Sequence, residues 1–189
     1  MKFKPIEPNR GDFITSIPDN MIQWAKKNNI VVRGTNWIVS CFYQLHLILP
    51  GHSLLWSKHT NNPDWTWNLF GEEFEEVIYK HVDDTMDHFN DLGVIHWDVI
   101  NEMIDQGGTN HTYYTDQSGN PNIRADIHIH VKEKYPNNAF YINDYGILMN
   151  DQNRFTLFQD LLRGLFSSGV QVDGIGLQSH LSGNLLCLF

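Results

Sequence analysis

The chain has 189 residues, of which 41% are hydrophobic, and a formal net charge of −9. This composition is typical of a single packed globular domain and excludes a disordered chain. The acidic balance argues against nucleic acid and against an anionic membrane surface as partners. The two cysteines, Cys41 and Cys187, specify neither a disulfide framework nor a zinc site. No sequence pattern specifies an oligomeric state.

Apolar periodicity predicts that helices alternate with short strands along most of the chain. A short helix is expected over 19–29, and it leads into a buried strand over 30–32. Such alternation implies a parallel sheet covered by helices, either as a (β/α) barrel or as an open doubly wound sheet. No GxGxxG or P-loop motif is present, which disfavours a nucleotide-binding sheet. The other expected helices span 71–92, 121–135 and 152–168, and the other strands span 94–100, 139–142 and 172–177.

Two stretches do not fit this alternation. Residues 35–50 contain no charged residue and interrupt the first expected strand. Polar residues such as Asn36 and Gln44 break the apolar run, which excludes a transmembrane helix. Residues 185–189 are also apolar, and the two cysteines lie only in these two stretches.

Three polar clusters stand directly after expected strands. In a parallel α/β barrel, catalytic groups lie where the strands end and the following loops begin. A strand end that simply meets water also favours polar residues, so one cluster alone carries little weight. Three in succession favour a shared site, and they are Asn101-Glu102, Asn143-Asp144-Tyr145 and Gln178-Ser179-His180.

Four ordered motifs resemble glycoside hydrolase family 10, which consists mainly of endo-β-1,4-xylanases. The segments 1–3 and 7–11 are also similar to the MKW…EP..G region of that family. Any one motif is a weak signal, but their order and spacing together are specific. The four motifs are GHSLLW at 51–56, WDVINE at 97–102, YINDY at 141–145 and DGIGLQSH at 173–180.

The resemblance implies an α/β fold that is a partial (β/α)8 TIM barrel, comprising roughly strands 2–6 with their helices. Residues 1–189 are then a single incomplete catalytic domain. The implied reaction is retaining hydrolysis of xylan or a related β-1,4-glycan, with a polysaccharide as the partner and with no cofactor and no metal. Secretion is expected from the family, although the N-terminus shows no signal peptide.

The resemblance also assigns roles to individual residues. Glu102 matches the general acid/base, and Asn101 matches the residue that hydrogen-bonds the 2-hydroxyl of the sugar. His180 matches a histidine that holds the nucleophile. Trp97, inside an expected strand, is interpreted as a core residue. The other matches line the sugar site, with Tyr145 and Gln178 at the cleavage point and Lys2, His52 and Trp56 on the non-reducing side.

The nucleophile has no counterpart in this sequence. In the family it is a glutamate in an ITELD-like strand downstream of the QSH motif, whereas residues 181–189 contain neither Asp nor Glu. The first barrel strand and the last two also lack counterparts. We therefore expect these 189 residues to be inactive alone. The alternatives are a carbohydrate-binding remnant without catalysis and a non-functional fragment without a stable fold.

The segment 35–50 also departs from the family pattern, because family members read directly from Arg-Gly to His. Joining Gly34 to His52 restores that pattern. The hypothesis is that residues 35–51 are translated intron or another sequence error, and a genuine additional loop is the alternative.

Two weaker motifs lie outside the family pattern. His128 and His130 could suggest a metal pair, but residues two apart on a helix point to different faces. Asn110-His111-Thr112 matches the N-glycosylation sequon, which matters only for an exported protein.

Overall fold

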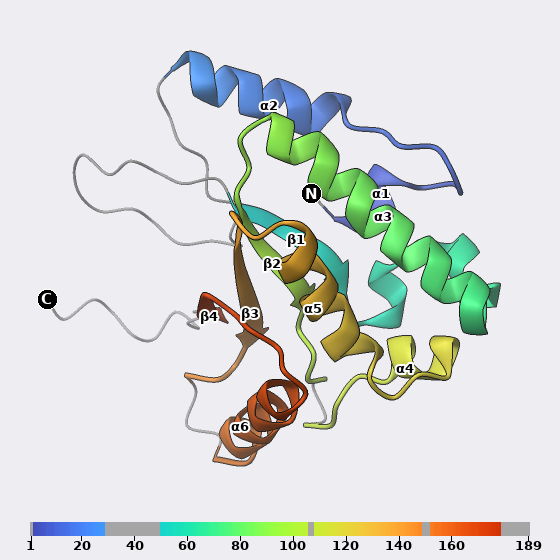
Figure 1. Cartoon of the computed structure of the whole chain (residues 1–189), viewed down its shortest axis with the longest axis vertical. Coiled ribbons are helices and arrows are strands. Elements are labelled where there is room, and N and C mark those ends of the chain that lie inside the picture. Colours follow the sequence, from blue (N-terminus) through green and yellow to red (C-terminus); the bar gives the residue numbers. More distant parts are fainter. Residues whose placement is uncertain (1, 29–49, 106–107, 149–151, 179–189) are drawn as a thin grey trace, which may run out of the picture.

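The computed structural model describes residues 2–28, 50–105, 108–148 and 152–178 (Figure 1). The expected strand over 30–32, the anomalous segment up to residue 49, His180 and the apolar C-terminal residues lie outside this part of the chain. Within it, no helix combines the length and the apolar character that crossing a membrane requires.

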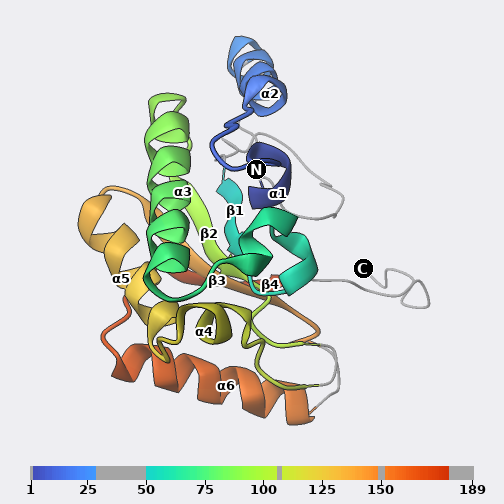
Figure 2. The same cartoon turned by 90° about the vertical axis from the view of Figure 1, so that its right-hand side faces the viewer.

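Four parallel strands form one sheet, and their spatial order follows the chain. Strand–helix–strand crossovers are right-handed, and the strand order does not reverse, so the connecting helices cover the same face of the sheet (Figure 1, Figure 2). This is a barrel segment, because a doubly wound sheet needs a reversal of strand order. The strands are β1 (Pro50–Trp56), β2 (His96–Asn101), β3 (Ala139–Tyr145) and β4 (Gly174–Gln178), and the long connecting helices are α3 (Gly71–Asp91), α5 (Ile123–Lys134) and α6 (Gln152–Ser167).

Alternation along β2 decides which side chains enter the core beneath the helices. Trp97 is fully buried, and its ring centroid lies 6.2 Å from that of Phe89 on α3. Val99, on the same side of the strand, is also fully buried. Asp98 stands between them and therefore points to the opposite face of the sheet. Trp97 is thus a core residue, as predicted, and Asp98 places a carboxylate on the face away from the helices.

The predicted long helices are present with small shifts at their ends. α3 and α6 match the expected ranges within one residue. α5 begins at Ile123, because Pro121 and Asn122 form a turn that precedes it. α2 (Ser16–Lys27) begins three residues earlier than predicted. Pro18 does not prevent this, because the N–H that proline lacks has no intrahelical partner in the first turn.

Two helices carry apolar residues that the rest of the described chain does not cover. On α2, Ile22 and Ala25 are buried, whereas Met21 and Trp24 are 59% and 61% exposed. On α6, Phe155 has the helical spacing of the buried Phe158 and Leu165 but is 41% exposed. Periodicity identifies the helix but does not show how much of its apolar arc the neighbouring elements cover.

The short elements were not predicted from the sequence. They are shorter than two helical turns, which is too short for an apolar period to show. These elements are α1 (Phe3–Ile6), α4 (Tyr113–Ser118) and the 3-10 helices η1 (His59–Asn61) and η2 (Asp64–Asn68).

Strand β4 is an open edge of the described sheet. Ile175 and Leu177 on this strand are 45% and 42% exposed. Exposed apolar side chains on an unpaired edge are the feature expected of a barrel that the described strands do not close.

His128 and His130, the pair with possible metal spacing, have different hydrogen-bond partners. The Nδ1 atom of His128 lies 2.7 Å from the Arg124 carbonyl oxygen, whereas Nε2 of His130 lies 2.8 Å from a carboxylate oxygen of Asp83. The two rings therefore face different surroundings. Within the described ranges, no cluster of three or more metal-binding side chains is present.

Burial of His128 predicts a loss of stability in mild acid. Burial lowers the pKa of His128 to about 4, partly opposed by the hydrogen bond to the Arg124 carbonyl, from about 6.5 in the unfolded chain. Because the unfolded chain takes up the proton first, this contribution to stability is complete above pH about 6.5 and is lost as the pH falls towards 4. We expect the loss to reach about 2–3 kcal/mol.

Urea denaturation at several pH values between 7.5 and 4.5 measures this loss, with His128→Asn as the comparison. The asparagine keeps an N–H that can donate to the Arg124 carbonyl but does not titrate. The difference in stability between the two proteins should therefore change by most of that amount across the series. A constant difference at every pH contradicts the assignment.

Candidate active site

The polar residues predicted at the strand ends meet along one rim of the sheet. Trp56 is in register with Asn101, and Asn101 in turn with Asn143 on β3. Tyr145 is in register with Gln178 on β4. One detail of the prediction is wrong, because these residues end the strands rather than follow them. The pairing between strands continues past the apolar residues of each strand. The last residues of β2, β3 and β4 therefore carry polar side chains while still belonging to the sheet.

Glu102 is the first residue beyond β2, and its backbone is left-handed with a φ of 53°. This conformation costs a residue other than glycine about 1 kcal/mol or more. Backbone hydrogen bonds to the neighbouring strand β3 and to the residue after β1 stabilise this conformation. The Glu102 N–H donates to the Asn143 carbonyl at 2.9 Å, and the Asn101 carbonyl accepts from the Ser57 N–H at 3.0 Å. Backbone strain at a residue that carries a carboxylate is characteristic of functional sites.

The Glu102 carboxylate is held between the first and last strands of the described sheet. Trp56, on β1, donates from Nε1 to Oε2 at 3.0 Å, and Gln178, on β4, donates from Nε2 to Oε1 at 3.1 Å. Each carboxylate oxygen has more than one acceptor position. The group is therefore oriented by two strands and can still exchange a proton with a bound molecule. Glu102, Trp56 and Gln178 come together as predicted.

Lys2 lies beside Trp56 and Glu102. Its Nζ atom lies 4.2 Å from the centroid of the Trp56 ring. Burial lowers the pKa of Lys2, and the negative charge of Glu102 partly opposes that shift. The cation, the indole and the carboxylate are therefore neighbours, which brings an N-terminal residue to the strand rim.

A buried polar chain links His52 to the same site. Asp98 accepts from two neighbours, with its Oδ2 2.6 Å from Nδ1 of His52 and 3.3 Å from Nδ2 of Asn143. Asn143 Nδ2 also donates to Oδ1 of Asn101 at 3.1 Å, and Gln178 Nε2 donates to the same oxygen at 3.2 Å. All four strands contribute to this chain, so the positions of the side chains are coupled across the sheet.

The side-chain amide of Asn101 has a fixed orientation, and its Nδ2 donor has no partner among the described residues. Its oxygen accepts from Asn143 and Gln178, which fixes the amide in one orientation. Asn101 is fully buried, and its Nδ2 atom has no hydrogen-bond partner among the residues that the structure describes. A buried N–H without a partner is costly, so this donor is suited to a polar group of a bound molecule.

Sequence reasoning missed Asp98 and Gly176 as positioning residues, and it placed Asn143 in a polar cluster without giving it a role. A Cβ atom at Gly176 would lie 2.5 Å from Asn143 Oδ1, so only glycine leaves room for that side chain. A signal for Asp98 was present, because it is the one carboxylate inside the largely apolar strand expected over 94–100. A charged residue in such a strand needs a buried partner.

Arg154 on α6 was also missed, and it clamps the loop after Glu102 to the end of β3. Its guanidinium donates to the carbonyls of Tyr145 at 2.7 Å, Asp105 at 2.6 Å and Ile104 at 3.1 Å. It also pairs with the buried Asp144 at 2.9 Å and lies 4.0 Å from the centroid of the Tyr145 ring. Nothing in the sequence marks this arginine, because it lies nine residues beyond the end of β3 and outside the family motifs.

The surroundings of Asp144 and Tyr145 raise the pKa of both side chains. Burial raises the pKa of Asp144 to about 6, although the Tyr145 N–H, the Arg154 charge and the Ile104 N–H oppose the shift. Burial also raises the pKa of Tyr145; the charge of Arg154 opposes this shift, and the negative charge of Glu102 adds to it. Tyr145 therefore lies in the field of Glu102, as the prediction requires. The predicted role of His180 falls outside the described residues.

A carboxylate at a strand rim, flanked by an indole, a lysine and oriented amides, is suited to acid/base chemistry on a sugar. The sequence model of Glycosyl hydrolase family 10 matches residues 1–186. The chain belongs to this family. The resemblance seen in the four motifs is thereby confirmed, and the four-stranded sheet is part of the TIM barrel of family 10.

Two family 10 relatives match almost the whole chain. Endo-beta-1,4-xylanase Xyn10C of Cellvibrio japonicus is 26% identical over 194 residues, which cover 97% of this chain and 29% of the relative. Endo-1,4-beta-xylanase A of Thermoanaerobacterium saccharolyticum is 27% identical over 197 residues, which cover 97% of this chain and 15% of that relative.

Solved structures of family 10 share the fold. TsXylA, an intracellular xylanase from Thermoanaerobacterium saccharolyticum solved as a mutant in complex with xylotriose, aligns with a TM-score of 0.77 at 24% identity. The alignment covers 95% of this chain and 53% of TsXylA. The chain therefore spans about half of that structure, and less than a third of the two relatives above.

Proposed function

We propose that Glu102 is the general acid/base of a retaining endo-β-1,4-xylanase site that acts on xylan or a related β-1,4-glycan. The observation that carries the proposal is the position of its carboxylate at the strand rim, where Trp56 and Gln178 each donate one hydrogen bond to it. The relatives named above are endo-β-1,4-xylanases, and TsXylA was solved with xylotriose.

In the retaining reaction this carboxyl group acts first as a general acid and then as a general base. As an acid, it gives its proton to the glycosidic oxygen while the bond from that oxygen to C1 breaks and a second carboxylate bonds to C1. As a base, it then takes a proton from water while the water oxygen bonds to C1 and releases the second carboxylate. A carboxylate that is oriented but retains free acceptor positions suits both steps.

The neighbouring side chains support recognition of a sugar. The free Nδ2 donor of Asn101 fits a hydrogen bond to the 2-hydroxyl beside the reacting carbon. Trp56, with Lys2 against its ring, fits the apolar face and the hydroxyls of the sugar on the non-reducing side. His52, held by Asp98, and Tyr145, held by Arg154, complete the proposed cradle.

We expect the purified 189-residue chain to bind xylotetraose without releasing reducing sugar from xylan, because residues 181–189 supply no second carboxylate. Calorimetric titration measures the binding, and a reducing-sugar assay measures turnover. Trp56→Ala should weaken binding about tenfold, the loss typical of one aromatic contact. Trp24→Ala, which removes an indole that is 61% exposed on α2, should bind like the parent.

Release of reducing sugar by this chain contradicts the expectation of a missing nucleophile, and equal binding by both variants contradicts the proposed cradle. Binding without turnover also fits a carbohydrate-binding remnant. Activity of a completed barrel distinguishes the two, because a remnant gains none.

We also propose that the segment 35–51, whose last two residues begin β1, is a sequence error. Its removal puts Gly34 in the place of Gly51, immediately before His52 on β1. Sequencing of the mature transcript tests this directly, and a transcript that keeps these codons in every tissue contradicts it. Secretion stays an expectation, because TsXylA of the same family is described as intracellular.

A further inference from the structure

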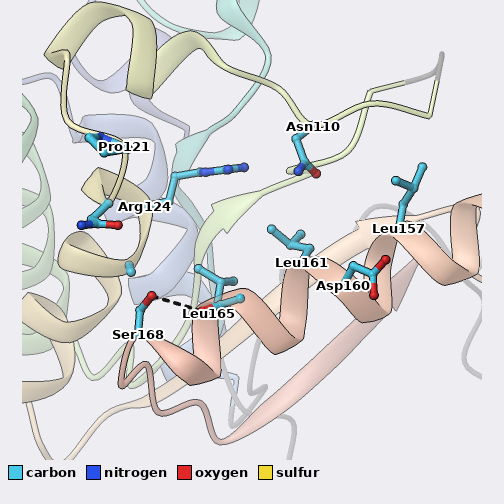
Figure 3. A pocket seen from close by; sticks show the side chains of 11 residues that line it. Asn110, Pro121, Arg124, Leu157, Asp160, Leu161, Leu165 and Ser168 are labelled. Atoms are coloured by element: carbon cyan, nitrogen blue, oxygen red, sulfur yellow. Dashed lines mark hydrogen bonds between the residues drawn. The ribbon is translucent and has the colours of Figure 1, made fainter.

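A cavity lies between the start of α5 and α6, on the helical side of the sheet (Figure 3). Its volume is about 300 Å³. Pockets of this size hold small molecules, and a few oriented polar groups within them usually fix the ligand. None of the residues assigned to the strand-rim site lines this cavity.

Arg124 is the basic group that lines the cavity. Figure 3 shows its side chain extending from α5 across the space towards Asn110. Its Nη1 atom is buried and has no hydrogen-bond partner in the described part of the chain, and no acidic side chain there pairs with it. A buried guanidinium nitrogen without a partner is unfavourable unless a bound group supplies an acceptor. Burial lowers the pKa of Arg124, which agrees with a desolvated cation.

The remaining walls are apolar on one side and polar at the rim. Leu161 and Leu165 on α6 are 7% and 6% exposed and form an apolar wall. Asn110 supplies an exposed amide, and Asp160 supplies a carboxylate that already pairs with Arg163 at 2.7 Å. A cation opposite apolar carbons, with polar groups at the rim, is complementary to a small anion that has an apolar face and hydroxyls.

We propose that this cavity binds a carboxylated monosaccharide, a hexuronate, through the guanidinium of Arg124. The planar carboxylate accepts a bidentate pair of hydrogen bonds from the guanidinium. One face of the sugar ring packs on Leu161 and Leu165, and its hydroxyls reach Asn110 and Asp160. The carboxylate of Asp160 repels a doubly charged phosphate more strongly than a singly charged uronate in the same space. This site does not depend on the proposed function of Glu102.

Calorimetric or NMR titration of the full 189-residue chain with glucuronate tests the proposal. We expect saturable millimolar binding, with binding of glucose, the matched neutral sugar, at least tenfold weaker. Arg124→Met should weaken glucuronate binding at least tenfold, whereas Arg10→Met, which removes an exposed arginine paired with Glu73, should leave it unchanged. Inorganic phosphate should bind less tightly than glucuronate.

A second variant keeps the test decisive if Arg124→Met fails to fold. A Cβ atom at Gly164 on α6 meets no atom within 4 Å, so Gly164→Leu extends into the cavity and also favours the helix. It should melt no lower than the parent and lose glucuronate binding.

The source of the uronate is distinguished by comparing free glucuronate with a xylo-oligosaccharide that carries a glucuronosyl branch. Binding of either one that depends on Arg124 supports the site and identifies its source. Equal affinity for glucose and glucuronate, unchanged glucuronate binding in both variants, or tighter binding of phosphate overturns the proposal.

Discussion

Replacing Glu102 by Gln in a completed family 10 barrel is expected to lower kcat/KM on xylo-oligosaccharides by about 10²–10⁴-fold, the usual contribution of a positioned general acid or base. The completed barrel continues residues 1–178, without 35–51, into the remaining strands of a relative such as TsXylA. Glutamine preserves the shape and can accept a hydrogen bond from Trp56, but it cannot give a proton to the leaving oxygen.

The matched control is Glu72→Gln, because Glu72 is exposed in the first turn of α3 and is not one of the residues that hydrogen-bond to Glu102. It should leave kcat/KM within about twofold, as is usual for surface substitutions remote from a site. A completed barrel that hydrolyses xylan equally well with and without Glu102→Gln assigns the acid/base role to another residue.

Replacing Arg154 by Met is expected to destabilise the fold by about 3–5 kcal/mol. The variant leaves the buried Asp144 without its cation and frees the carbonyls of Ile104, Asp105 and Tyr145 from their donor. Chemical denaturation measures the loss. Arg163→Met on the same helix is the control, because its pair with Asp160 is exposed and should contribute less than about 0.5 kcal/mol.

The pH dependence of the Arg154→Met variant separates a buried charge from lost packing. The pKa of Asp144 is raised to about 6 in the folded protein, against about 3.9 unfolded. A raised pKa means that the contribution of Asp144 is fully present below about pH 3.9 and is lost as the pH rises through 6. Without Arg154 the folded pKa rises further, so the loss of stability should be larger at pH 8 than at pH 5. Adding Asp144→Asn should remove that pH dependence; if the loss is equal at both pH values, the charge is not its cause.

The fold was predictable from sequence because its helices and strands are long enough to show a period. Trp97 and the stripe of α3 are examples, since each apolar position faces one continuous core. The short helices α1 and α4 contain too few residues to show a pattern. Trp24 shows a second limit of this approach. It has helical spacing on α2, but the spacing does not show whether another element buries it, and it is exposed.

Most of the site was predictable because its residues lie within specific motifs at strand ends. Glu102, Asn101 and Gln178 were found in this way, and the parallel register brings them together. The supporting residues were not found, because their roles depend on three-dimensional contacts. Arg154 acts from a helix far along the chain, and the role of Gly176 is to leave room for Asn143.

The most direct measurement of the role of Glu102 compares two substrates of the completed barrel that differ only in the leaving group. An aryl xylobioside with an acidic phenol needs no proton on departure, whereas xylotetraose releases a sugar hydroxyl that does. The account predicts that Glu102→Gln loses at least about 100-fold more in kcat/KM on xylotetraose than on the aryl substrate. Equal losses on both substrates contradict it, because Glu102 would then contribute to binding or folding but not to proton transfer.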